Sequence, residues 1–424
     1  MTTATKTPSA TAAYLSAFND RETALTAGDR PAVRRLRSAA IARFGEIGFP
    51  GERNEDWKFS NVGPYTRTTF RLPPADVSRT ERTVEAAALP PGVLLMSLAD
   101  AAQKHPELVE PYLGQLADHK YHAFAGLNTA FWQDGAFLHV PDGVAVEAPV
   151  FLTSRATAVD GEPTLWYRRV LVVLGRNSQA RVVESFAGDG GTYATNAVAE
   201  FVLADGASLD HYKIQEEATE AFHLAGTHVQ QGRDSRFSTH YVGLGGGFVR
   251  NEVRVVFGGT NGEATVNGLY RAAGTQHHDT LTVIDHAQPH CASHELYKGI
   301  LDGKARGVFN GKIFVRLDAQ KTDAKQTNQT LLLSDDATIN TKPQLEIFAD
   351  DVKCTHGATV GQLDDDQLFY LRARGIGDEQ ARALLTFAFA NDIISRIQVP
   401  ALRERLEQVL LQSSHLPPLA DFEV

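Results

Sequence analysis

The chain is poor in cysteine, in long apolar runs and in net positive charge, and each shortage excludes a class of protein. Its 424 residues contain only two cysteines, Cys291 and Cys354, too few for a disulfide framework. No apolar run approaches the roughly 18 residues that a membrane-spanning helix needs, and the N-terminal segment lacks the apolar block of a secretory signal. The net charge of −10 argues against nucleic acid as a partner. We therefore expect a cytoplasmic protein that binds neither membrane nor nucleic acid.

Motifs for nucleotide hydrolysis and for nucleophilic catalysis are also missing. The segment GILDGKA, from Gly299 to Ala305, has the wrong spacing for a phosphate-binding loop and lacks its hydroxyl residue. The glycine-rich segment GLGGG at 243–247 is not a dinucleotide fingerprint, and no G-x-S-x-G sequence occurs. We therefore expect no enzymatic activity in this chain.

The spacing of apolar residues divides the chain into three zones. From about 11 to 132 apolar residues recur at helical intervals. From about 134 to 351 short apolar runs alternate with glycine and asparagine turns about 28 residues apart, and from about 364 helical periodicity returns. The middle zone favours a β-solenoid such as a parallel β-helix, with a β-sandwich as the alternative.

Histidines are concentrated in one part of the middle zone, where Cys291 lies among them. Imidazole and thiolate suit iron, zinc and copper. However, adjacent residues such as His290 and Cys291 face opposite sides of a strand, so we expect a polar ladder with Cys291 as a small buried apolar group. The alternative is a free-standing homodimeric metal-binding protein that uses the 277–294 cluster. Its five histidines are His277, His278, His286, His290 and His294.

Cys354 and His356 are two residues apart, so on a strand both side chains would point to the same face. A neutral imidazole is an iron ligand, and Lys353 would favour the thiolate form of Cys354. Two ligands do not complete a metal site. The pair therefore makes sense at an interface where a partner adds ligands; the alternative is that Cys354 is buried packing and His356 a turn residue.

Four stretches of the chain resemble one known family. They are RNEDWKF at 53–59, YKGILDGKARGVFNG at 297–311, KTDAKQTNQTLLL at 321–333, and the segment that runs from CTHGATVG at 354–361 to DQLFYLRARGI at 366–376. In these stretches the chain is similar to the SufB/SufD family of iron–sulfur cluster assembly scaffolds. The Cys-x-His-Gly-Ala-Thr pattern resembles the SufD branch, because the SufB branch is distinguished by cysteines that mark the cluster-building subunit.

The resemblance implies a mainly β fold, with a right-handed parallel β-helix at 133–352 between helical domains at 1–132 and 353–424. It implies a cytoplasmic complex with one SufB-like paralogue and two SufC-like ATPase subunits, while the isolated chain can form a homodimer. His356 matches the histidine that faces a SufB cysteine, where iron or a nascent cluster is held transiently, and Cys354 is the thiol beside it. No permanently bound cofactor is implied.

The resemblance also implies that the C-terminal helices, about 364–397, bind the ATPase. Their apolar surface is larger than about 60 residues of helix can bury alone. The expected docking residues are Phe369, Tyr370, Arg372, Arg374, Ile376, Leu384, Leu385, Phe387 and Phe389.

A polysaccharide-cleaving β-helix enzyme is a further alternative. Paired carboxylates such as Asp350 and Asp351, or the acidic run at 364–366, could act as acid and base. Against it, the acidic run lies where a helix is expected to begin, and acidic side chains stabilise a helix N-terminus without any catalytic role.

Overall fold

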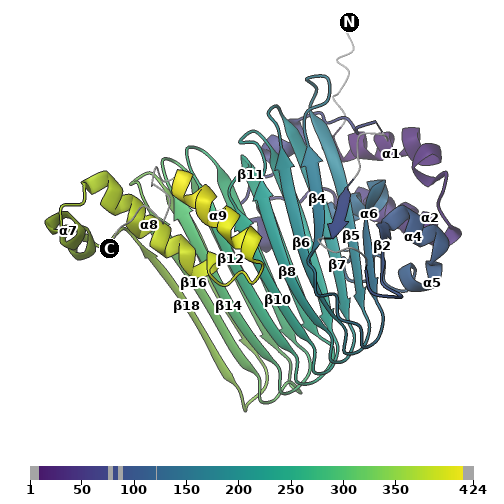
Figure 1. The fold of residues 1–424 in the computed structure, drawn as a ribbon. Helices are drawn as coiled ribbons and strands as arrows, with labels where there is room; N and C mark the ends of the chain where they lie inside the picture. Colours follow the sequence, from purple (N-terminus) through teal and green to yellow (C-terminus); the bar gives the residue numbers. More distant parts are fainter. Residues whose placement is uncertain (1–8, 75–79, 85–88, 121, 414–424) are drawn as a thin grey trace, which may run out of the picture.

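Two nine-stranded sheets form the body of the molecule, with helices on their outer faces (Figure 1). The computed structural model describes residues 9–74, 80–84, 89–120 and 122–413. Sheet A contains, in spatial order, β2 (Leu94–Ser97), β3 (Asp134–Val140), β5 (Thr164–Leu174), β7 (Tyr193–Leu203), β9 (Phe222–Gln231), β11 (Phe248–Phe257), β13 (His277–His286), β15 (Arg306–Val315) and β17 (Thr338–Ile347). Sheet B contains β1 (Glu81–Val84), β4 (Val150–Ala156), β6 (Gln179–Gly188), β8 (Ser208–Glu216), β10 (Arg236–Gly243), β12 (Glu263–Ala272), β14 (Ala292–Leu301), β16 (Asp323–Leu332) and β18 (Lys353–Gly361).

The chain alternates between the two sheets, so each coil adds one strand to each sheet. Strands from β3 onwards pair in parallel with the strand one coil away, as β10 does with β8 and β12. Only the short β1 and β2 at the start pair antiparallel, with β4 and β3. This is a parallel β-helix, so the prediction of a β-solenoid is confirmed and the β-sandwich alternative is wrong.

One corner of successive coils is built from residues in the left-handed conformation. Asn177, Gly206, Asp234 and Asn261 all have positive φ. The backbone N–H of Asn177 donates to the Asp205 carbonyl in the next coil at 2.9 Å, and that of Gly206 donates to the Arg233 carbonyl at 2.7 Å. Glycine, asparagine and aspartate adopt this conformation at the lowest cost. The turns that recur in the sequence therefore lie above one another at this corner of the β-helix.

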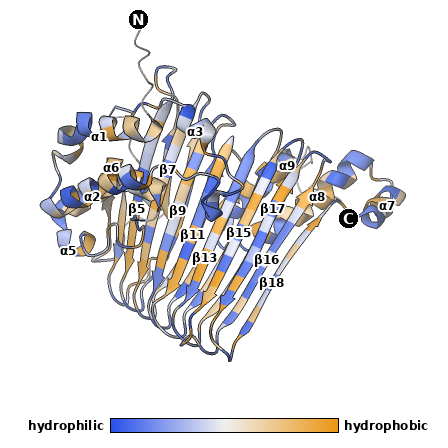
Figure 2. Cartoon of the chain, turned by 180° about the vertical axis from the view of Figure 1, so that it is seen from behind, coloured by the Kyte–Doolittle hydropathy of each residue, from blue (hydrophilic) through white to orange (hydrophobic). Residues whose placement is uncertain are grey.

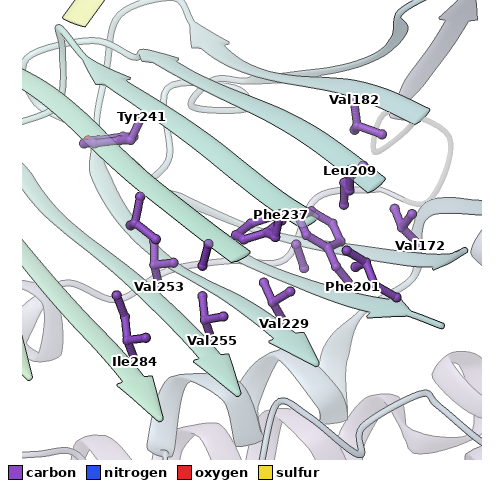
Figure 3. Packing of buried hydrophobic residues seen from close by; sticks show 14 of the residues in the cluster. Val172, Val182, Phe201, Leu209, Val229, Phe237, Tyr241, Val253, Val255 and Ile284 are labelled. Carbon is purple, nitrogen blue, oxygen red and sulfur yellow. The ribbon is translucent and has the colours of Figure 1, made fainter. Parts of the chain in front are cut away.

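Apolar side chains fill most of the interior between the two sheets. Figure 3 shows Val182, Leu209 and Phe237 of sheet B facing Phe201 and Val229 of sheet A. Every second residue of a strand points inward, which is the ordinary alternation of a β-strand. At roughly 25 cal/mol per Å² of apolar surface removed from water, such a core is the main stabilising contribution to the coils.

The N-terminal helices cover the outer face of sheet A. Their aromatic residues pack on strands β5, β7 and β9, for example Phe131 against Tyr167, whose rings stack at 5.2 Å. The helices are α1 (Ala10–Thr26), α2 (Pro31–Ile47), η1 (Glu55–Trp57), α3 (Gly63–Arg67), α4 (Leu98–Lys104), α5 (Pro106–Val109) and α6 (Ala123–Phe131).

Three C-terminal helices follow the last strand: α7 (Asp365–Ala373), α8 (Asp378–Ile394) and α9 (Pro400–Ser413). Helices α8 and α9 lie across the outer face of sheet B, whereas α7 projects away from the sheets (Figures 1 and 2). Strand β18 belongs to sheet B although it lies beyond residue 352, where the helical segment was expected to begin. None of the helices in the described ranges is long and apolar enough to cross a membrane.

Candidate functional site

Strand β18 is the free edge of sheet B at the C-terminal end of the β-helix (Figure 1). Among the described residues it pairs only with β16, in a register that places Cys354 beside Ala324 and His356 beside Gln326. Both of these neighbours are buried inside the β-helix. Cys354 and His356 therefore continue two inward-facing rows of side chains, as the prediction of a shared face required. His356 is nevertheless exposed, because no further coil follows β18 in the part of the chain that the structure describes.

The Cys354 thiol is half-buried against the interior core. Burial raises the pKa of this thiol above its ordinary value, and nearby Asp323 adds to the increase. The expected shift toward the thiolate form beside Lys353 is therefore wrong for the isolated chain, because burial and Asp323 raise the pKa of Cys354. A metal ion or a positively charged partner group would be needed to hold Cys354 as a thiolate.

The row that ends at His356 contains two buried polar residues in the preceding coils. Glu295 lies beside Gln326, and Gln326 lies beside His356. Gln326 Nε2 donates to Glu295 Oε2 at 2.8 Å, and burial raises the pKa of Glu295 to about 7. A carboxyl group that titrates near neutrality therefore lies two strands inward from the exposed imidazole.

A second polar cluster lies deeper in the β-helix. Lys213 Nζ donates to Asn251 Oδ1 at 2.9 Å, and burial lowers the pKa of Lys213 to about 8. His211 Nε2 lies 2.9 Å from Glu184 Oε2. We did not predict these residues. The one sequence signal is the alternation of polar residues along β8, where His211, Lys213 and Gln215 occupy every second position.

The predicted docking residues fall into two groups. Phe369 and Tyr370 on α7 are 73% and 57% exposed, and the Arg374 guanidinium lies 4.9 Å from the Tyr370 ring centroid. Arg372 is also exposed, and Ile376, Leu384, Leu385 and Phe389 are half-buried. Phe387, in contrast, is only 8% exposed and belongs to the core between α8 and sheet B. The free apolar surface is therefore concentrated on α7.

The five histidines of the 277–294 cluster do not meet. His278 and His286 point into the β-helix, whereas the Nε2 atom of His277 lies 2.8 Å from the hydroxyl of Ser60 on the opposite side of the strand. His290 occupies the left-handed corner, and His294 is exposed. Across the described ranges, no three His, Cys, Asp or Glu side chains form a group that could hold a metal ion. Cys291 is buried among apolar side chains, as expected.

The acidic residues have structural partners. Asp364 is the N-cap of α7 and accepts from the Gln367 N–H at 2.9 Å, which confirms the capping explanation. Asp351 forms an ion pair with Lys321. In the RNEDWKF motif, Glu55 and Asp56 form ion pairs with Lys342 of β17 and Lys312 of β15. This motif therefore fastens the N-terminal segment to sheet A.

Comparisons with known proteins agree with this architecture. Residues 155–389 match the family model described as SUF system FeS cluster assembly, SufBD core domain, and residues 8–78 and 76–152 match the SufBD protein N-terminal region. An iron–sulfur cluster assembly SufBD family protein of Synechocystis is 33% identical over 92% of this chain and 93% of its own length. The iron–sulfur cluster assembly protein SufD of Escherichia coli is 31% identical over 85% of this chain and 88% of its own length. Because the core-domain match alone spans more than half of the 424 residues, the chain belongs to the SufBD family of iron–sulfur cluster assembly proteins.

Proposed function

We propose that the chain is a non-catalytic scaffold subunit for iron–sulfur cluster assembly, paired end to end with a SufB-like paralogue and coupled to two SufC-like ATPase subunits. Cys354 and His356 contribute to the interface, where His356 binds iron or a nascent cluster transiently and the paralogue supplies the remaining ligands. The pair on this chain is too small a ligand set to retain a cluster alone.

The position of His356 and Cys354 on an unpaired edge strand carries this proposal. An edge strand presents free backbone N–H and C=O groups, and these pair readily with a strand of another chain. Exposed apolar side chains lie on the same coil: Phe348 is 59% exposed and Val360 is 45% exposed. Burial of these side chains by a partner would add a hydrophobic contribution to backbone pairing.

The C-terminal helices provide the second contact. We assign ATPase docking to α7, through Phe369, Tyr370, Arg372 and Arg374, with the half-buried Ile376, Leu384, Leu385 and Phe389 at its border. Helix α8 packs on sheet B, so closure of two ATPase subunits would transmit force to the coils that precede β18. This force would open the interface at β18 and expose His356 to iron. ATP must then bind the complex with the open interface more tightly than the complex with the closed one, because a ligand of equal affinity for both does not shift the equilibrium between them.

Affinity purification of the tagged chain from its native cells, followed by native mass spectrometry, tests the assembly. We expect one paralogue and two ATPase subunits per copy of this chain. Recovery of the chain alone, with stoichiometric metal, would overturn the proposal.

His356→Ala tests the role of the interface residue in that complex. We expect subunit stoichiometry to be retained and cluster formation to fall at least tenfold, because a ligand is lost from an exposed site that contributes little to folding. Thr355→Ala is the matched control, since Thr355 is exposed on the same strand but its side chain points to the other face. Equal cluster formation in both variants would show that His356 is not a ligand.

A further inference from the structure

A cavity lies between the N-terminal segment and the outer face of sheet A. Its volume is about 250 Å³, and its lining comes from η1 and α6 on one side and from β7, β9 and β11 on the other. Strand β18 is the last strand of the other sheet, so this cavity is separate from the proposed interface. This volume lies just below the usual range of ligand-binding cavities, so only a small metabolite would fit.

Small residues on the strands and aromatic residues opposite them create the hollow. Ala225 and Gly226 of β9 form part of the floor, and Trp57 and Phe124 form part of the wall. A Cβ atom on Gly226 would lie 2.8 Å from His228 Nε2, so glycine is what allows this imidazole to lie over its own strand. The hollow therefore depends on the residue choice at these positions.

His228 is a buried polar side chain at this cavity. It is 4% exposed and lines the cavity. Its ring centroid lies 6.5 Å from that of His122, which also lines the cavity. An imidazole that lines a cavity can donate a hydrogen bond to a ligand atom or accept one from it.

The charged groups around the cavity leave one cation incompletely paired. Asp56 pairs with Lys312, and Arg250 pairs with both Asp279 and Glu252. The remaining cation, Arg254, lies 3.5 Å from Glu252, which Arg250 already contacts at 3.0 Å. The Nε–H of Arg254 is buried without a hydrogen-bond partner. The other buried polar atoms of the described lining without a hydrogen-bond partner are Arg250 Nη2 and Asn196 Oδ1, so two of the three are guanidinium donors.

The neighbourhood favours an anion over a metal cation. Arg254 is close enough to lower the pKa of both imidazoles, after the larger effect of burial. Glu252 opposes this effect at both imidazoles, so the unpaired donor of Arg254, and not the net charge of the lining, favours an oxyanion. A guanidinium binds carboxylate or phosphate oxygens through two parallel hydrogen bonds, and a neutral imidazole can donate one more.

We infer that this cavity binds a small oxyanion-bearing metabolite, a carboxylate or a phosphate, held by the guanidinium of Arg254 and by the ring N–H groups of His228 and His122. Such a ligand would bridge α6 and sheet A and would tighten their packing. The inference does not depend on the proposed function of β18.

Isothermal titration calorimetry on the purified full chain tests this assignment. The probes are inorganic phosphate, L-malate and L-lactate, with lactamide as the uncharged counterpart of lactate and chloride at matched ionic strength. We expect saturable 1:1 binding of at least one oxyanion and none of lactamide. Binding of phosphate alone would identify a phosphate site, and binding of malate or lactate alone a carboxylate site.

Three variants locate the binding. Arg254→Gln and Gly226→Ala should each weaken binding at least tenfold, the second by displacing the His228 ring. Arg236→Gln is the control, because its side chain is 71% exposed on sheet B, and it should bind as the unmodified chain does. Circular dichroism confirms that each variant is folded, and Gly226→Ala keeps the test decisive if Arg254→Gln does not fold. Absence of saturable binding, or undiminished binding by folded Arg254→Gln or Gly226→Ala, overturns the inference.

Discussion

At the scale of single residues, buried charges fasten the segment between α5 and α6 to sheet A. Glu200 on β7 accepts hydrogen bonds from the backbone N–H groups of Gly114, Leu116 and Ala117 at 2.9–3.0 Å, and it pairs with Arg169. Burial alone would raise the pKa of Glu200, but Arg169 and these N–H groups lower it below its ordinary value. The carboxylate is thus held ionised inside the fold.

Glu200→Gln should destabilise the chain by about 3–5 kcal/mol, because it leaves the Arg169 guanidinium buried without its counter-charge. Urea unfolding measures the change. Glu263→Gln is a suitable control, since that side chain is 61% exposed and surface substitutions shift stability by about 0.5 kcal/mol or less. A Glu200→Gln effect no larger than the control would contradict this account.

The pKa of the buried Glu295 is shifted in the opposite direction from that of Glu200, which makes the stability of the chain fall as the pH rises. Burial raises its pKa to about 7 from an ordinary value of 4.5. As the pH rises, the unfolded chain therefore loses this proton at a lower pH than the folded chain does. The contribution of Glu295 to stability is complete below pH 4.5 and is lost as the pH rises through about 7. Glu295→Gln should therefore stabilise the chain more at pH 8 than at pH 5, by up to roughly 3 kcal/mol. Urea unfolding of both forms at the two pH values checks this, and an equal difference at both would contradict it.

These buried groups were not predictable from the sequence. The sequences of β7 and β14 do not show whether Glu200 and Glu295 point into the β-helix or away from it. Only the register with the neighbouring coils decides this. Cys354 and His356 were predictable as a pair because residues two apart share a face on any strand. The increase in the pKa of Cys354 was not predictable, because it depends on burial of the thiol by the preceding coil.

At the scale of elements, α7 and α8 differ in whether their apolar side chains are exposed or packed against a sheet. Phe369 on α7 is 73% exposed, whereas Phe387 on α8 is 8% exposed against sheet B. Sequence alone could not separate them, because α8 is apolar on more than one face and its periodicity does not mark the packed side. The strand-rich middle zone, in contrast, was predictable because its turns recur with the coil.

Phe387→Ala should cost about 3–5 kcal/mol of stability, as large-to-small changes in a packed core do. Phe369→Ala should leave the unfolding midpoint of the isolated chain unchanged and reduce recovery of the ATPase subunit in affinity purification. Thermal unfolding and pull-down of both variants distinguish core from docking surface. Full ATPase recovery with Phe369→Ala would remove α7 as the docking element.

At the scale of the whole molecule, stability should vary along the β-helix. Each coil is stabilised mainly by its neighbours, and β18 has a neighbour on one side only, with exposed side chains along nearly its whole length. Hydrogen–deuterium exchange should therefore be fastest at β18 and slowest in β8, β10 and β12, which α8 and α9 cover. Addition of the paralogue should slow exchange at β18 specifically. Uniform exchange across the coils would contradict this gradient.

The two ends of the β-helix also differ in kind. The first coil is closed by the short antiparallel strands β1 and β2, whereas the last coil ends in parallel strands with a free edge. The four-residue β1 and β2 offer a partner fewer backbone hydrogen-bonding groups than the ten-residue β17 and the nine-residue β18, so end-to-end joining should favour the C-terminal end. Joining two chains through these ends would cover the terminal strands β17 and β18 of both participants. In that arrangement the molecule would be monovalent, and a pair joined through these ends would leave no long strand edge from which a fibre could grow.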